Sequence, residues 1–247
     1  MRGQNFDCVI EPYQVVKLAS SVVGVIGALY VDRGSVVRRG QIVGKLDDSV
    51  ESANLALARA KAADQFDAGA LQARIEFLKV RRDRAEQLAA RSIVTRAVRD
   101  EAVSDLHVAE QQLAGAQLNQ KVARLEVRHQ QSLVEQKRLR SPVDGVVTEI
   151  LLRKGEYRNE QSPVMTIAQI DPLRVEVFVP TRYYGQISAG MAASVMPERP
   201  VGGAYPAKVQ IVDRVIDAAS GTYGVRLLLP NTGRKVPAGL QCKVRFG

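Results

Sequence analysis

The side chains that could carry chemistry are few in this sequence, and they are far apart. The two histidines, His107 and His129, stand too far from each other along a helix-forming segment to share a metal ion. The two cysteines, Cys8 and Cys242, lie close to opposite ends of the chain and not at the spacing of metal ligands. We therefore expect no metal centre, and we interpret the histidines as surface residues.

A carboxylate pair, Asp47 and Asp48, stands at the start of the same helix-forming segment. Acidic residues at that position cap a helix and interact favourably with its dipole, so we interpret the pair as caps. No serine, histidine and acid can be placed together on one element. We expect no catalytic residue and no cofactor, and hence no enzyme.

Composition and charge limit the classes of partner. The net charge of +9 suits nucleic acid, an anionic membrane surface or an acidic protein. The basic residues are scattered and lack interleaved aromatic side chains, so we do not expect a nucleic-acid partner. No apolar run is long enough to span a membrane, and the first five residues do not form a signal peptide, so any targeting segment is expected to be trimmed or upstream.

An internal repeat organises the chain. Residues 20–46 align without gaps on residues 141–167. Each copy reads as short strands with apolar residues at alternate positions, broken by glycines at turns. Neither copy could bury its apolar face alone, so residues 13–49 and 139–170 are predicted to pair as two half-modules of one β-sandwich. The matched pairs are Ser20/Ser141, Val22/Val143, Gly24/Gly145, Val25/Val146, Leu29/Ile150, Gly34/Gly155 and Val43/Val164.

The intervening segment, residues 50–138, is predicted to be helical because it is rich in helix formers and almost free of glycine and proline. Asp48 and Glu51 have the spacing of a capping box at its start, and Pro142 marks its end. Both ends meet the same β module, so the segment must fold as an antiparallel coiled-coil hairpin with its turn near residues 92–95, each arm reaching roughly 60 Å. The expected seam is Ala102, Leu106, Ala109, Leu113, Ala116, Gln120, Ala123, Val127, Gln130 and Val134 in the second arm, and Leu57, Leu71, Leu78, Ala85 and Ser92 in the first.

Residues 171–247 are predicted to form a small antiparallel β-barrel, with a boundary at Asp171-Pro172 and residues 4–12 adding a further strand. If that strand lies beside the last one, Cys8 and Cys242 come close enough for a disulfide, as an oxidising compartment permits. Two separate buried thiols are the alternative.

The expected fold class is therefore α+β: an elongated, multi-domain chain with a split lipoyl/biotinyl-like β-sandwich, an inserted hairpin and a barrel. This order of parts resembles the HlyD-like membrane fusion proteins over nearly the whole chain. The amino-acid sequences of the half-modules resemble those of this family too: Val-Asp-Arg-Gly-Ser-Val-Val-Arg-Arg-Gly-Gln at residues 31–41 and Leu-Arg-Ser-Pro-Val-Asp-Gly-Val-Val at residues 139–147.

The resemblance extends to a docking pattern at the hairpin tip. Adaptors of this family that dock on TolC-type channels carry an arginine, a leucine and a serine at set spacings, followed by an aspartate and an alanine. This sequence has Arg84, Leu88, Thr95, Asp100 and Ala102 there, with threonine replacing serine. The resemblance implies that Leu88 anchors in a groove, Arg84 donates to the channel and Thr95 caps the second helix. A seam leucine and an ordinary cap are the alternative.

The resemblance implies a periplasmic adaptor associated with the inner membrane. It would link a transporter there, of the RND type, to a TolC-type outer-membrane channel for small-molecule export, and would self-associate into a ring, a hexamer. An ABC-type exporter is the alternative transporter. A biotin or lipoyl carrier is the alternative of another class, but the nearest lysine to the joint between the half-modules, Lys45, lies inside a strand pattern and not at a hairpin tip.

Overall fold

The computed structural model describes residues 4–64 and 66–247. The chain forms two compact units. The first combines the chain up to Asp47 with Arg138–Gly247 and is built of strands, whereas the second, Asp48–Lys137, is helical. Gln65, which belongs to the predicted helical segment, lies outside the described residues.

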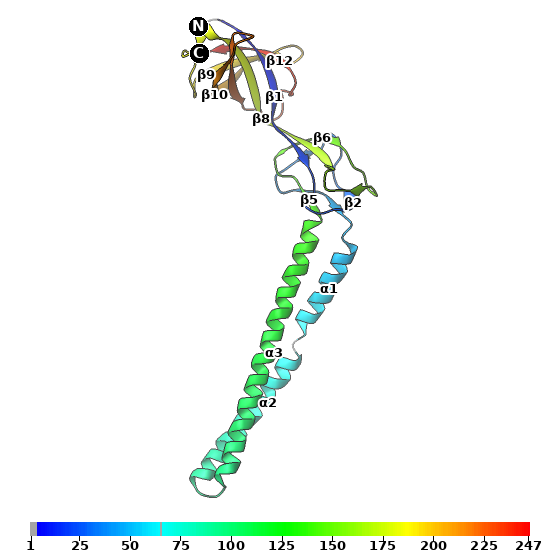
Figure 1. Cartoon of the computed structure of the whole chain (residues 1–247), viewed down its shortest axis with the longest axis vertical. Helices are drawn as coiled ribbons and strands as arrows, with labels where there is room; N and C mark the ends of the chain where they lie inside the picture. Colours follow the sequence, from blue (N-terminus) through cyan, green and yellow to red (C-terminus); the bar gives the residue numbers. More distant parts are fainter. Residues whose placement is uncertain (1–3, 65) are drawn as a thin grey trace. The chain divides into compact units, whose positions relative to one another are not determined.

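Six strands of the first unit close into a small barrel (Figure 1). Their hydrogen-bonded order is β1, β12, β9, β10, β11 and β8, and β8 pairs again with β1, so no edge is left open. Alternate residues of β11 and β12 face the barrel core, as the period of a strand requires. The bounds are β1 Phe6–Leu18, β8 Met165–Pro180, β9 Ala192–Pro197, β10 Tyr205–Asp217, β11 Thr222–Leu229 and β12 Gln241–Phe246; a short 3-10 helix, η1, follows β8 at Thr181–Tyr183.

The remaining strands of this unit form the lipoyl-like module, in which the two repeat copies interlock. In the sheet order β5, β4, β2, β7 and in the β3–β6 pair, strands of one copy bond to strands of the other. Val37 and Val43 of the first copy share one core with Val147 and Val164 of the second. Neither copy has a core of its own, as the repeat predicts. The bounds are β2 Gly24–Leu29, β3 Val36–Val37, β4 Ile42–Leu46, β5 Arg138–Arg140, β6 Gly145–Ile150 and β7 Tyr157–Arg158.

Strands β1 and β8 run through both the barrel and the lipoyl-like module. Their ladder extends from Cys8 opposite Val177 to Leu18 opposite Met165, with an irregularity between Pro12 and Gln14. The domain boundary predicted at Asp171-Pro172 thus lies inside the continuous strand β8, whose residues before it pair with β6 and whose residues after it pair with β11. A bulge accommodates the prolines without ending the pairing.

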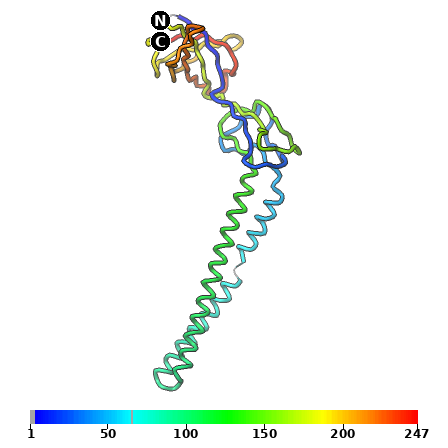
Figure 2. The backbone as a smooth tube through the Cα atoms, in the orientation of Figure 1, coloured from blue at the N-terminus to red at the C-terminus, as the bar shows by residue number. Residues whose placement is uncertain are grey.

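The second unit is a helical hairpin of α1 (Ser49–Ala63), α2 (Phe66–Ala90) and α3 (Arg96–Gln136). Helices α1 and α2 both pack on α3, and Figure 2 shows the chain reversing between α2 and α3. All ten residues of the seam predicted in the second arm are buried or half-buried on α3, while most positions between them are exposed. Within the described part of the chain, none of the helices combines the length and the apolar character needed to cross a bilayer.

The first arm differs from the prediction because it is two helices with different phases. Leu55 and Ala58 are the buried residues of α1, whereas Leu57 is 57% exposed. In α2, Leu78 and Ala85 are buried as predicted. The buried positions of α2 lie one residue earlier than a heptad repeat continued from the buried positions of α1 would place them. Asp64 has extended backbone angles after α1, so the helical phase is not carried across. The assignment of Leu57 to the seam is wrong, and Ser92 lies in the turn beyond α2.

This change of phase predicts opposite outcomes for two leucines. Leu78→Ala should lower the free energy of unfolding of the hairpin by about 2 kcal/mol, because it removes a buried side chain. Leu57→Ala should change it by less than about 0.5 kcal/mol, because Leu57 is exposed. Urea unfolding followed by circular dichroism at 222 nm measures both. Equal losses would contradict the change of phase.

The start of α1 also differs from its prediction. Asp48 is the N-cap residue, but its side chain makes no capping hydrogen bond. Glu51 instead forms an ion pair with Lys137, the residue that follows α3. Their charged atoms are 3.0 Å apart, and both side chains are largely buried. The predicted capping box is therefore absent, because the carboxylate that would complete it joins the two arms at their base.

Candidate docking site at the helical turn

The turn between α2 and α3 has a defined backbone. The amide of Ser92 donates to the carbonyl of Ala89 and the amide of Ile93 donates to the carbonyl of Leu88, both at 2.9 Å. Ser92 lies in the left-handed region with φ 59°. These features form a Schellman motif, which satisfies carbonyls at the end of α2 and reverses the chain. Thr95 follows as the N-cap residue of α3.

The residues of the predicted docking pattern are not all at this turn. Leu88 and Thr95 lie there, and Arg84 is exposed one helical turn earlier. Asp100 is exposed on α3, where its Oδ1 accepts hydrogen bonds from Nε and Nη2 of Arg99 at 2.9 and 2.6 Å. Ala102 is only 2% exposed, because it belongs to the seam four residues before Leu106. Ala102 therefore has no surface to offer a partner.

Two expectations about the turn need correction. Leu88, expected as an exposed anchor, is half-buried. Thr95 has the position of a cap, but its side chain makes no capping hydrogen bond. The large aliphatic side chain that the turn does expose is Ile93, at 64%. Its sequence signal was a bulky apolar residue inside the predicted turn, where no heptad position explains it.

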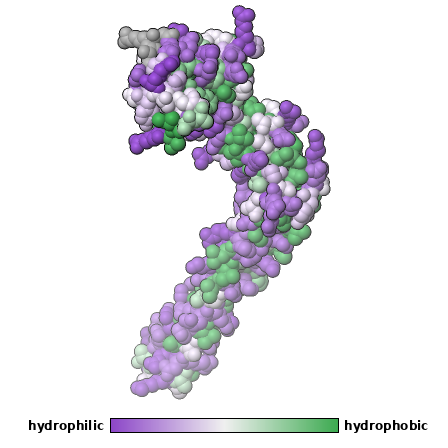
Figure 3. Space-filling view, turned by 45° about the horizontal axis from the view of Figure 1, so that its top comes forward, coloured by the Kyte–Doolittle hydropathy of each residue, from purple (hydrophilic) through white to green (hydrophobic). Residues whose placement is uncertain are grey.

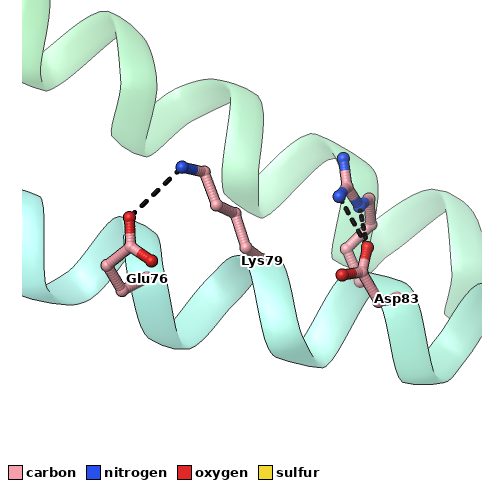
Figure 4. A network of polar contacts seen from close by, with 4 residues as sticks. Glu76, Lys79 and Asp83 are labelled. Atoms are coloured by element: carbon pink, nitrogen blue, oxygen red, sulfur yellow. Dashed lines mark hydrogen bonds and ion pairs between the residues drawn. The ribbon is translucent and has the colours of Figure 1, made fainter.

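Charged side chains cover the hairpin beside the turn. Figure 4 shows Lys79 of α2 directed at Glu76, and Asp83 bonded by a guanidinium, that of Arg82. Arg81 crosses to α3, where it lies 2.9 Å from Asp105. These side chains are largely exposed, so each pair contributes little stability. On the face that Figure 3 shows, hydrophilic residues separate the apolar surface of the hairpin into small patches.

The other candidate residues are placed as follows. Lys45 is half-buried within β4, opposite Ala28 and Arg138, and α1 follows that strand directly. This position argues against a carrier lysine, which needs an exposed hairpin tip. His107 and His129 are exposed on α3, and the described residues contain no cluster of metal-ligating side chains.

The cysteines lie directly opposite each other on β1 and β12, and a disulfide joins them in the structure. Both are buried in the barrel core, at 3% and 2% exposure. The bridge therefore ties the first barrel strand to the last.

Comparison with known proteins adds relatives of low identity. No family model matches the chain. The macrolide export protein MacA of Yersinia pestis is 26% identical over 236 residues, which cover 91% of this chain and 62% of that protein. A UPF0194 membrane protein of Acidithiobacillus ferridurans is 29% identical over 175 residues, covering 66% of this chain and 48% of that protein. The chain thus spans about half to three-fifths of the length of these curated relatives.

Solved structures match over the whole chain. MacA from Actinobacillus actinomycetemcomitans superposes with a TM-score of 0.69 at 20% identity, covering 99% of this chain and 78% of that one. The membrane fusion protein Spr0693 from Streptococcus pneumoniae gives 0.64 at 14% identity, covering 99% of both chains. The periplasmic adaptor protein EmrA gives 0.56 at 13% identity, covering 100% of both.

The chain shares the fold of these membrane fusion proteins. The match includes both units, since the coverage leaves almost no residue of this chain out. This fold accounts for a β module that is interrupted by a helical hairpin.

Proposed function

We propose that the chain is the periplasmic adaptor of a tripartite pump, linking an inner-membrane transporter to a TolC-type outer-membrane channel for the export of small molecules. The observation that carries the proposal is the hairpin. It is only two helices thick, so it serves for reach and contact. The export role in the name of the macrolide export protein MacA supports the same class.

Self-association into a ring, a hexamer by resemblance, is part of this proposal. The lipoyl-like module carries two equivalent apolar cross-strand pairs on its surface. Val25 lies opposite Tyr157, and Val36 lies opposite Val146, which is the repeat counterpart of Val25. Three of these side chains are 41 to 62% exposed. Two similar patches on one module suit a head-to-tail contact between neighbouring copies, which can close into a ring.

The disulfide supports a periplasmic location, because such bonds persist in oxidising compartments. An anchor to the inner membrane and an RND-type transporter complete the proposal.

The test is copurification from cells of the full-length, tagged protein after mild crosslinking. We expect a transporter and an outer-membrane channel in the complex, and their sequences decide between an RND and an ABC partner. Leu88→Asp should reduce recovery of the channel by about tenfold while the transporter is retained, because the change places a charge where the turn meets its partner.

Lys61→Asp, at an exposed position of α1 far along the chain from the turn, is the matched control. Recovery of neither membrane protein with the wild-type chain would contradict the adaptor function. Normal recovery of the channel with Leu88→Asp would contradict a docking role for the turn at Leu88.

A further inference from the structure

Ile93 is an apolar side chain that the fold leaves in solvent. It is 64% exposed, and the hairpin seam ends at Ala85 and Ala102, before the turn. A single exposed aliphatic residue is common on protein surfaces and by itself indicates nothing. Its surroundings make it informative.

The surroundings of Ile93 are cationic. From Gln87 to Arg99 the chain carries three arginines and no carboxylate. Arg99 is bonded to Asp100, but among the described residues neither Arg91 nor Arg96 forms an ion pair. These two arginines flank Ile93 two residues before it and three residues after it. The turn is therefore an apolar point between two unneutralised positive charges.

This arrangement works against the stability of the hairpin. The first turn of α3 contains no acidic residue but carries Arg96 and Arg99, at the helix end where the dipole favours negative charge. Ser92 occupies a left-handed position that usually takes glycine. Local choices that lower stability without a compensating contact are expected at functional sites.

We propose that Ile93 is the anchor of the docking site, and that its receptor is an apolar pocket on a partner protein, rimmed by carboxylates. The proposal rests on the adaptor function and names the chemistry of the channel surface that the turn meets. Arginine is enriched at interface hot spots, and its guanidinium pairs well with carboxylates. An exposed isoleucine between two such arginines can fill an apolar pocket that the partner's carboxylates surround. A membrane surface is less suitable, because one isoleucine buries far less apolar area than an interfacial helix does.

The experiment places a photoreactive side chain at the anchor in cells that produce the full-length protein. Ile93→p-benzoylphenylalanine should form an adduct with the outer-membrane channel, in a yield at least about tenfold above that from the same group at Val108, which is 50% exposed elsewhere on α3. Mass spectrometry should locate the crosslinked residue beside aspartate or glutamate. Adducts with the channel from position 88 but not from position 93 would overturn the anchor and leave the adaptor function standing.

A second experiment tests the role of the two arginines. With the photoreactive group at position 93, Arg91→Glu together with Arg96→Glu should lower the adduct yield at least about tenfold, whereas Arg91→Lys together with Arg96→Lys should keep most of it. Equal yields from the two pairs would overturn the carboxylate rim. Binding of the purified protein to phosphatidylglycerol vesicles that Ile93→Asp abolishes would instead assign the turn to a lipid surface. Copurification of the channel with the wild-type chain tests the adaptor function separately from both crosslinking experiments.

Discussion

Replacing both Cys8 and Cys242 by alanine should lower the free energy of unfolding of the first unit by up to about 5 kcal/mol. The two residues are 234 positions apart, so their disulfide closes a loop of nearly the whole chain and removes much conformational freedom from the unfolded state. Alanine keeps both buried positions apolar, which limits the added loss of packing. The measurement is urea unfolding of periplasmically produced protein, followed by tyrosine fluorescence, since all seven tyrosines lie in the first unit.

The control is the wild-type protein unfolded with a reductant, which should lose a similar amount. The transition at 222 nm, dominated by the hairpin, should move little because neither cysteine lies in the second unit. Titration of the denatured, unreduced wild-type protein should find no free thiol. Two reactive thiols per chain would contradict the bridge.

Gly145→Ala should destabilise the first unit by about 3 kcal/mol or more. A Cβ atom at this position would lie 2.4 Å from the carbonyl oxygen of Ala168 and 2.9 Å from its carbon. Both atoms belong to the backbone of β8, so no side-chain rotation relieves the overlap. The strand pair β6–β8 must separate there, and β8 also belongs to the barrel. The tyrosine transition should shift to lower urea.

Gly115→Ala is the matched control, with the opposite sign. Gly115 lies inside α3, where an added Cβ would meet no atom within 4 Å. Alanine is the better helix former by up to about 1 kcal/mol, so the 222 nm transition should shift to higher urea. A Gly145→Ala protein as stable as the wild type would show that the close approach of β6 and β8 is not required.

The elements that could be predicted from the sequence are those with an uninterrupted period. The repeat keeps its spacing over both half-modules, and the seam of α3 keeps its heptads over one unbroken helix. The first arm failed at Leu57 because the end of α1 at Ala63 resets the helical phase, an event without a proline or glycine to mark it. The repeat also contains an exception, because Arg158 of the second copy aligns with Val37 of the first.

Burial of Arg158 depends on one carbonyl far away in the sequence and on two in the turn that follows it. It is 4% exposed, and its guanidinium donates to the carbonyls of Val22, Glu160 and Ser162. An arginine in an alternating pattern predicts a surface position, and three carbonyl acceptors cannot be read from the sequence.

At the candidate site, the position of the turn could be predicted, but the exposure of its residues could not. Which side chains face solvent there depends on the left-handed angle at Ser92, which serine seldom adopts. Ala102 fits both the docking pattern and the heptad seam, and in the structure it is buried in the seam. The spacing of residues indicated the region of the site, and the backbone reversal determined which residues it presents.

The interlocked core of the lipoyl-like module has a consequence for biosynthesis. Strand β4 bonds to β5, but the whole helical unit is made between them. When the first copy leaves the ribosome, its apolar residues have no partner, and they stay exposed until the second copy follows. Packing of α1 and α2 on α3 shortens that open loop and brings the ends of β4 and β5 together, which lowers the entropic cost of their pairing. The hairpin is thus also the folding aid of the module that carries it, and a hairpin that assembles slowly prolongs the time in which the nascent chain can aggregate.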